Sequence, residues 1–185
     1  MRSDNPYKTL STRIAYKNPW ITVEENAIIH PDGREGIYGI VKSNDSVTVL
    51  PVNEKGEILL IRAFSYPGNK WHWELPGGGS NGGDDFVKAS KRELLEETGI
   101  SAEKWQQIGL TRPLDGIATE RMAVLIAENL TINDIPPADD NGVIDERKFF
   151  DLTTIHNMVK NGMIDEGQTL SALYYYELWR KKNNE

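Results

Sequence analysis

The 185-residue sequence contains no cysteine. This absence excludes a disulfide framework, a thiolate metal site and a cysteine nucleophile, and it fits a reducing compartment. Long apolar runs are also missing, since none approaches the roughly 20 residues that a transmembrane helix needs. Residues 1–6 lead into no apolar segment, which argues against a signal peptide. We therefore expect a cytoplasmic protein with no membrane partner.

Basic residues are in the minority. The chain has 21 Lys and Arg against 28 Asp and Glu, which gives a formal net charge of -7. Nucleic-acid binding depends on clustered basic side chains, so this balance argues against a nucleic-acid partner. A polyanionic small molecule can still bind where metal ions neutralise its charge locally.

The predicted elements follow the order of an α+β fold, with mixed strands and a few helices rather than a regular βαβ alternation. The apolar segments 47–52 and 57–61 are joined by a turn at 53–56, so they are expected to form an antiparallel pair in the core. A hairpin is indicated at 31–33. Strands are expected at 14–16, 20–24, 27–30, 36–41, 47–52, 57–61, 71–75, 105–110, 123–127 and 143–150, and helices at about 84–98, 153–161 and 169–182.

A cluster of carboxylates on one predicted helix is the strongest chemical signal. The helix is expected over about residues 84–98, with Gly99 well placed to end it. Glu93, Glu96 and Glu97 are three and four positions apart and therefore share one helix face. Their mutual repulsion is relieved well by a hard divalent cation such as Mg²⁺, which takes oxygen ligands. The plain alternative is a solvated acidic face that pairs with nearby Lys and Arg side chains.

A glycine-rich loop at 76–83 directly precedes this helix. Glycines let the backbone approach closely and leave carbonyl oxygens available as ligands. From Gly77 onward the loop also satisfies G-x-G-x-x-G, the pattern of dinucleotide-binding proteins. That fingerprint requires a ribose-binding acid about 20 residues on, at the end of a second strand. The distance falls inside the helix, at Glu96 and Glu97, so a dehydrogenase is disfavoured.

The loop and helix together resemble the Nudix box, G-x5-E-x7-R-E-U-x-E-E-x-G-U, in which U is a bulky apolar residue. Asp84 departs from the pattern, because the family has Glu at that position. The motif is specific, and the resemblance implies a metal-dependent pyrophosphohydrolase. The remaining positions of the box are matched by Gly78, Arg92, Glu93, Leu94, Glu96, Glu97, Gly99 and Ile100.

Segments outside the box resemble the ADP-ribose and nucleotide-sugar pyrophosphatase branch of that family. Residues 60–67 (LIRAFSYP) and 73–78 (WELPGG) carry the similarity. The resemblance implies a Nudix α/β/α sandwich with a mixed sheet over residues 43–185. It also implies a small antiparallel β unit over residues 1–42, which that branch uses for substrate contacts and for building a homodimer.

The resemblance implies roles for individual residues as well. Arg92 is expected to anchor the helix carboxylates through charge-assisted hydrogen bonds. Arg62 is expected to bind the diphosphate, whereas Ser65 stands where the branch commonly has a second arginine. Mg²⁺ is the expected cofactor, with Mn²⁺ as an alternative. The expected metal ligands are Glu93 and Glu97, with Glu96 assisting, and the carbonyl oxygen of Gly77.

The general base is expected in a loop outside the box. Glu120 sits where related enzymes keep a glutamate, and we rank it first as a site residue. Asp140, in a second acidic loop at 133–141, is the second candidate. Nucleobase recognition is assigned to Trp20, by stacking, and to Arg34, if strands of a partner subunit reach the site.

The sequence therefore predicts Mg²⁺-dependent hydrolysis of the diphosphate bond in a nucleoside diphosphate linked to a sugar, by attack of water on phosphorus. Two other interpretations within the family stay open. One is a nucleoside triphosphate pyrophosphohydrolase, and the other is a Nudix domain that senses a nucleotide without hydrolysing it. A third interpretation is an acidic interaction module that has no ligand.

Overall fold

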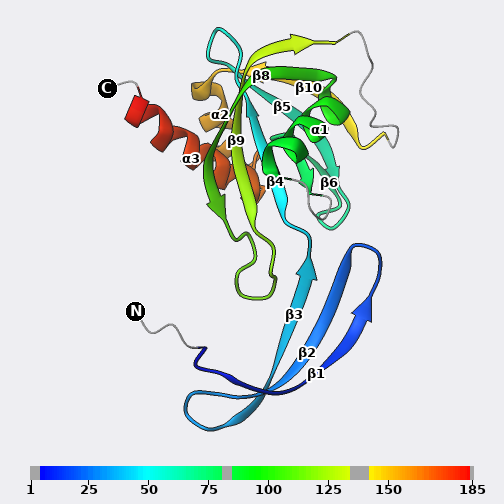
Figure 1. Ribbon diagram of the computed structural model, residues 1–185. Helices are drawn as coiled ribbons and strands as arrows, with labels where there is room; N and C mark the ends of the chain where they lie inside the picture. The colour runs from blue at the N-terminus through cyan, green and yellow to red at the C-terminus, as the bar shows by residue number, and fades with distance from the viewer. Residues whose placement is uncertain (1–4, 81–84, 134–141, 184–185) are drawn as a thin grey trace. The chain divides into compact units, whose positions relative to one another are not determined.

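The computed structural model describes residues 5–80, 85–133 and 142–183 (Figure 1). The chain divides into two compact units, of which the first comprises Met1–Asp45 and Leu114–Glu120 and the second comprises Ser46–Pro113 and Arg121–Glu185. The described elements are β1 (Lys8–Lys17), β2 (Ile21–Ile29), β3 (Glu35–Ser43), β4 (Ser46–Pro51), β5 (Ile58–Ser65), β6 (Lys70–Glu74), β7 (Gly77–Gly79), α1 (Phe86–Thr98), β8 (Ile100–Thr111), β9 (Met122–Ile132), β10 (Ile144–Phe150), α2 (Leu152–Lys160) and α3 (Gly167–Asn183).

The first unit is a three-stranded antiparallel sheet in the order β1-β2-β3. The two strands expected at 20–24 and 27–30 form the single strand β2. The expected hairpin connects β2 to β3, where the Gly33 amide donates to the His30 carbonyl at 2.9 Å and Gly33 takes a φ of 88°. All ten residues of β1 are exposed. The small N-terminal antiparallel β unit is therefore confirmed.

The described residues of the second unit form two sheets, in the orders β7-β4-β9-β8 and β10-β5-β6. The expected antiparallel pairing of 47–52 with 57–61 is wrong, because β4 and β5 belong to different sheets and share only the isolated bridge Val52↔Ile58. The turn was predicted correctly, since the Asn53 side chain accepts hydrogen bonds from the backbone amides of Lys55 and Glu57. The partner of β4 is β9, which pairs with it in parallel and lies far away in sequence. A local turn signal cannot predict such a partner.

The two faces of β4 and β9 enter different cores. Alternate residues of a strand point to opposite faces, and a strand that is apolar throughout needs cover on both. Leu50 and Val124 pack on one side with residues of α2 and α3, whereas Val49 and Leu125 face the side covered by α1. Figure 1 shows α1 and the α2–α3 pair on opposite sides of the strands. This arrangement confirms the α/β/α sandwich with a mixed sheet.

Candidate active site

Helix α1 carries the carboxylates of the box. It begins at Phe86, two residues later than expected, because Asp85 caps it by accepting a hydrogen bond from the Lys88 amide at 2.7 Å. A carboxylate at this position also suits the positive end of the helix dipole. Gly99 ends the helix with a φ of 69°, as the sequence predicts. Asp84 lies outside the described residues.

Arg92 connects two of the helix carboxylates to the glycine segment. Its Nη1 lies 2.8 Å from Glu93 Oε1 and 2.9 Å from Glu96 Oε2. Its Nη2 donates to the Gly79 carbonyl at 2.7 Å. One guanidinium therefore fixes both carboxylates relative to β7, which is the anchoring contact expected for this arginine.

Glu93 is the most buried of the three acids. Only 9% of the residue is exposed, and this burial raises its pKa, while the charge of Arg92 acts in the opposite direction. Its carboxylate lies directly against the backbone of Gly78, where an added Cβ would sit 2.7 Å from the carboxyl carbon. Only glycine leaves room for the acid at this point.

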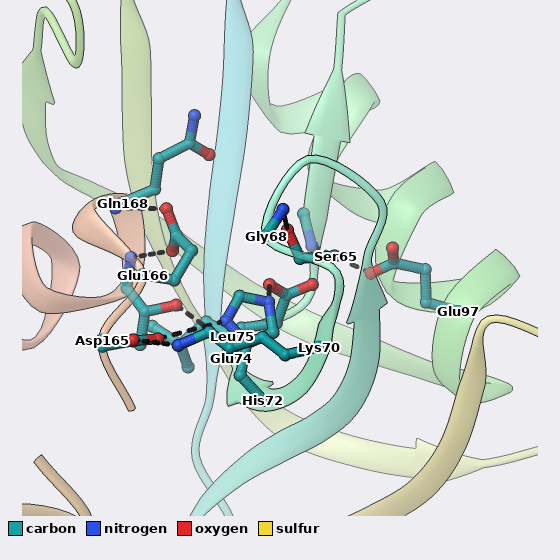
Figure 2. A network of polar contacts seen from close by, with 12 residues as sticks. Ser65, Gly68, Lys70, His72, Glu74, Leu75, Glu97, Asp165, Glu166 and Gln168 are labelled. Carbon is teal, nitrogen blue, oxygen red and sulfur yellow. Dashed lines mark hydrogen bonds and ion pairs between the residues drawn. The ribbon is translucent and has the colours of Figure 1, made fainter. Parts of the chain in front are cut away.

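Glu97 is held by the same short strand. The Gly77 amide donates to Glu97 Oε2 at 2.9 Å (Figure 2). The predicted glycine loop thus contains the strand β7, which pairs with β4 so closely that a Cβ on Gly77 would lie 2.3 Å from the Val47 carbonyl oxygen. The sequence assigned a carbonyl role to Gly77, whereas the observed contact uses its amide.

The donor chemistry of this cluster fits a hard divalent cation. Carboxylate oxygens are the ligands that Mg²⁺ and Mn²⁺ favour, and a cation would offset the buried charge of Glu93. Over the described ranges, no group of three His, Asp or Glu side chains is arranged to hold a metal ion. Glu93 and Glu96 face Arg92, and Glu97 faces the Gly77 amide. The metal role of these residues stays a prediction.

Arg62, the predicted diphosphate ligand, is held by β10. Its Nε donates to Asp145 Oδ1 at 2.8 Å, and its Nη2 pairs with Asp145 Oδ2. Glu146 Oε1 lies 3.2 Å from the same Nε. The guanidinium also lies over the Trp71 ring, 5.6 Å from its centroid. The sequence analysis missed Asp145. Its pairing with Arg62 depends on the β5–β10 register, for which the local sequence carries no signal.

The other predicted site residues fall in the first unit or outside the described chain. Trp20 is 77% exposed beside a pocket of about 270 Å³. Arg34 forms an ion pair with Asp32 at 2.7 Å. Glu120 lies in the segment Leu114–Glu120 that belongs to this unit. Asp140 lies outside the described residues. The structure thus brings together the helix carboxylates, Arg92 and Gly77. Trp20, Arg34 and Glu120 belong to the other compact unit.

Comparison with known families assigns the chain. A family model described as the NUDIX domain matches residues 42–173. The chain belongs to the Nudix family. A second model, described as the nucleoside diphosphate sugar hydrolase N-terminal domain, matches residues 7–41 of this Nudix protein.

Individual relatives cover nearly the whole Nudix chain. The ADP-ribose pyrophosphatase of Bacillus subtilis (strain 168) is 26% identical over 176 residues, 92% of each chain. The methanol dehydrogenase activator of Bacillus methanolicus is 23% identical over 176 residues, also 92% of each chain. A crystal structure of an ADP compounds hydrolase shares the fold, with a TM-score of 0.87 at 18% identity, and the match covers 99% of this chain and 98% of that one.

The family assignment confirms the predicted enzyme class, because the chain is a Nudix pyrophosphohydrolase. Among the described residues, no helix is both long and apolar enough to cross a membrane.

Proposed function

We propose that this Nudix enzyme hydrolyses the diphosphate bond of a nucleoside diphosphate linked to a sugar, as in ADP-ribose. The observation that carries the proposal is the combination of two matches in one chain. A nucleoside diphosphate sugar hydrolase N-terminal domain at residues 7–41 directly precedes a Nudix domain at residues 42–173. The B. subtilis relative, which is named an ADP-ribose pyrophosphatase and matches 92% of this chain, supports the same substrate class.

The carboxylates of α1 are proposed to hold Mg²⁺, or alternatively Mn²⁺, through Glu93, Glu97 and Glu96, with the Gly77 carbonyl beside them. When bound, a divalent ion neutralises diphosphate charge and lowers the pKa of a coordinated water. Arg92 orients Glu93 and Glu96 through the contacts described above.

Arg62 is proposed to bind the diphosphate. Its Nε and Nη2 donate to Asp145, whereas its Nη1 donates no hydrogen bond to any residue that the structure describes. Trp71 supports the guanidinium from its flat side. An arginine fixed along one edge loses less conformational freedom when its other edge binds an anion.

The proposed reaction is a single displacement on phosphorus. A water oxygen forms the new P–O bond and the bridging P–O bond breaks, which releases two phosphomonoesters. The proton removed from water passes to a loop acid, for which Glu120 and Asp140 are the candidates. Trp20 and Arg34 are proposed to bind the nucleoside where the strands of a partner subunit reach the site, and the Trp20 pocket offers a surface on which a nucleobase can stack.

The substrate class is tested by comparing kcat/KM with Mg²⁺ on ADP-ribose, ADP-glucose, GDP-mannose and the matching nucleoside triphosphates. We expect diphosphate sugars to be preferred, with stronger discrimination between nucleosides than between sugars. A site that hydrogen-bonds its substrate rejects analogues lacking that partner strongly. Triphosphates exceeding every diphosphate sugar by more than tenfold would overturn the substrate class. Nucleotide binding with no release of phosphomonoesters would instead favour a sensor.

A homodimer built through the first unit is also proposed. β1 is exposed along its full length, and Leu10, Ile14, Tyr16 and Ile37 are each at least half exposed. Three strands with uncovered apolar side chains have little to stabilise them as a separate layer. A second copy of the same sheet would supply the missing cover.

A further inference from the structure

A buried histidine on β6 lies between two carboxylates that the proposed mechanism does not use. Lys70, His72 and Glu74 share one face of the strand, since alternate residues point the same way. His72 is 9% exposed. Its Nε2 lies 2.8 Å from Glu74 Oε2, and its Nδ1 lies 3.5 Å from Asp165 Oδ1 (Figure 2).

The opposing side of this network is the start of α3. Asp165 also pairs with Lys70. Glu166 caps α3 by accepting hydrogen bonds from the amides of Gln168 and Thr169, at 2.6 Å each. The buried Thr169 hydroxyl then accepts from the Leu75 amide at 3.0 Å. Contacts with the beginning of α3 therefore extend along the whole of β6, from Lys70 at its start to Leu75 just after its end.

The tied strand leads directly into the catalytic glycine segment. Gly77 follows Glu74 by three residues, and its amide donates to Glu97 Oε2. Between them, the Pro76 carbonyl accepts from the Val49 amide at 2.8 Å. Consecutive Cα atoms are about 3.8 Å apart, so this span leaves little slack between the position of Glu74 and that of Gly77.

Glu74 needs a partner to stay where it is. Burial raises the pKa of Glu74, and the neighbouring Glu166 raises it further, whereas His72 acts in the opposite direction. Without His72, the half-buried Glu74 carboxylate would lose its close contact with the His72 ring. It would still face the charge of Glu166. Removing one partner of a buried pair leaves an uncompensated charge, which destabilises the local arrangement.

We propose that His72 and Glu74 are positioning residues for catalysis. The close contact of His72 Nε2 with Glu74 Oε2 fixes the strand that presents the Gly77 amide to Glu97 and thereby helps to orient that acid. Asp165 Oδ1 lies 3.5 Å from His72 Nδ1, which has no hydrogen-bond partner among the described residues. The inference rests on the proposed metal role of Glu97.

The test compares His72→Ala, Glu74→Ala and Glu74→Gln in the full-length protein, with Mg²⁺ and ADP-ribose as the probes. The two alanine variants are expected to lower kcat at least about tenfold and to raise the Mg²⁺ concentration for half-maximal rate several-fold. KM for ADP-ribose should change less than about twofold, because neither residue contacts Arg62. Glu74→Gln keeps the hydrogen bond to His72 and should recover most of kcat.

His156→Ala is the control at a more exposed histidine, and melting curves of all variants show how far the loss of buried His72 lowers stability. The control removes another histidine–glutamate pair, His156 Nε2 with Glu177 Oε1 at 2.6 Å, which joins α2 to α3 and has no contact with the glycine strand. Wild-type kcat and Mg²⁺ response are expected. Equal losses in kcat in all three alanine variants would show a general stability effect and overturn the proposal. So would unchanged kinetics in His72→Ala and Glu74→Ala, or a Glu74→Gln as impaired as Glu74→Ala.

The outcome for Glu97→Gln separates this proposal from the one on which it rests. If Glu97→Gln is inactive while His72→Ala and Glu74→Ala behave as wild type, only the positioning role fails. If Glu97→Gln keeps full turnover, the metal assignment itself is wrong.

Discussion

Glu93 combines a buried position with a raised pKa, so its charge is unfavourable for folding. A folded-state pKa above the ordinary 4.5 means that stability falls as pH rises from 4.5 through the folded pKa. Above that window the ionised acid destabilises the fold, and Glu93→Gln removes this cost. We expect Glu93→Gln to lose at least about 100-fold in turnover while melting in EDTA at or above the wild-type temperature.

Melting curves at pH 5 and pH 8 check this expectation. The advantage of Glu93→Gln over the wild type should be greater at pH 8. A variant that melts well below the wild type at both values would show that the Arg92 ion pair outweighs the burial of Glu93.

Glu97 tests the metal site more directly, because it is one of the two principal metal ligands proposed and its Oε2 accepts from the Gly77 amide of the glycine strand. Glu97→Gln keeps the shape of the side chain and removes a charge. Turnover should fall at least about 100-fold, since metal activation supplies several kcal/mol of the barrier. Glu128→Gln, which breaks a surface pair with Lys104, serves as the control and should remain active. Near wild-type turnover of Glu97→Gln at saturating Mg²⁺ would contradict the assignment.

At the scale of elements, β7 depends on two glycines at positions where a side chain would clash with neighbouring atoms. A Cβ on Gly77 would meet the Val47 backbone, which cannot move without breaking the β4–β7 pairing. The atoms nearest to a Cβ on Gly78 would be those of the Glu93 carboxylate, at the end of a flexible side chain. We therefore expect Gly77→Ala to lower the melting temperature markedly, and Gly78→Ala to remain folded but lose turnover.

Thermal melting and steady-state kinetics on the two variants separate these effects. Gly39→Ala is a useful third variant because, its chain neighbours apart, no atom of the described residues lies within 4 Å of its added Cβ. If Gly77→Ala melts like Gly39→Ala, the close contact with Val47 is not as tight as described.

Elements with local determinants were predictable from the sequence. Helix α1, its end at Gly99 and the contacts of Arg92 with Glu93 and Glu96 depend on residues within one or two turns. The pairing of β4 with β9 depends on segments about 75 residues apart, so the turn at 53–56 suggested the wrong partner. The Arg62–Asp145 and His72–Asp165 contacts were missed for the same reason, since each joins distant segments.

For the whole molecule, we expect dimerisation to depend on the first unit. We expect sedimentation equilibrium to show a dimer, and Ile14→Lys with Ile37→Lys to shift it towards monomer by placing charges among exposed apolar side chains. Lys55→Glu, a charge change at an exposed turn of the second unit, is the control. A wild-type monomer at micromolar concentration would contradict the proposed dimer.

The segment Leu114–Glu120 lies within the Nudix match, yet it belongs to the N-terminal unit and forms an isolated bridge with β3. The Val41 amide donates to the Ile117 carbonyl at 2.7 Å, the Thr119 amide donates to the Val41 carbonyl at 3.0 Å, and the Tyr38 hydroxyl donates to the Gly116 carbonyl at 3.1 Å. The boundary between the two family models at residues 41 and 42 is therefore not a point at which the chain can be recombined cleanly. A chimera that exchanges the N-terminal domain with that of a relative would also have to exchange residues 114–120.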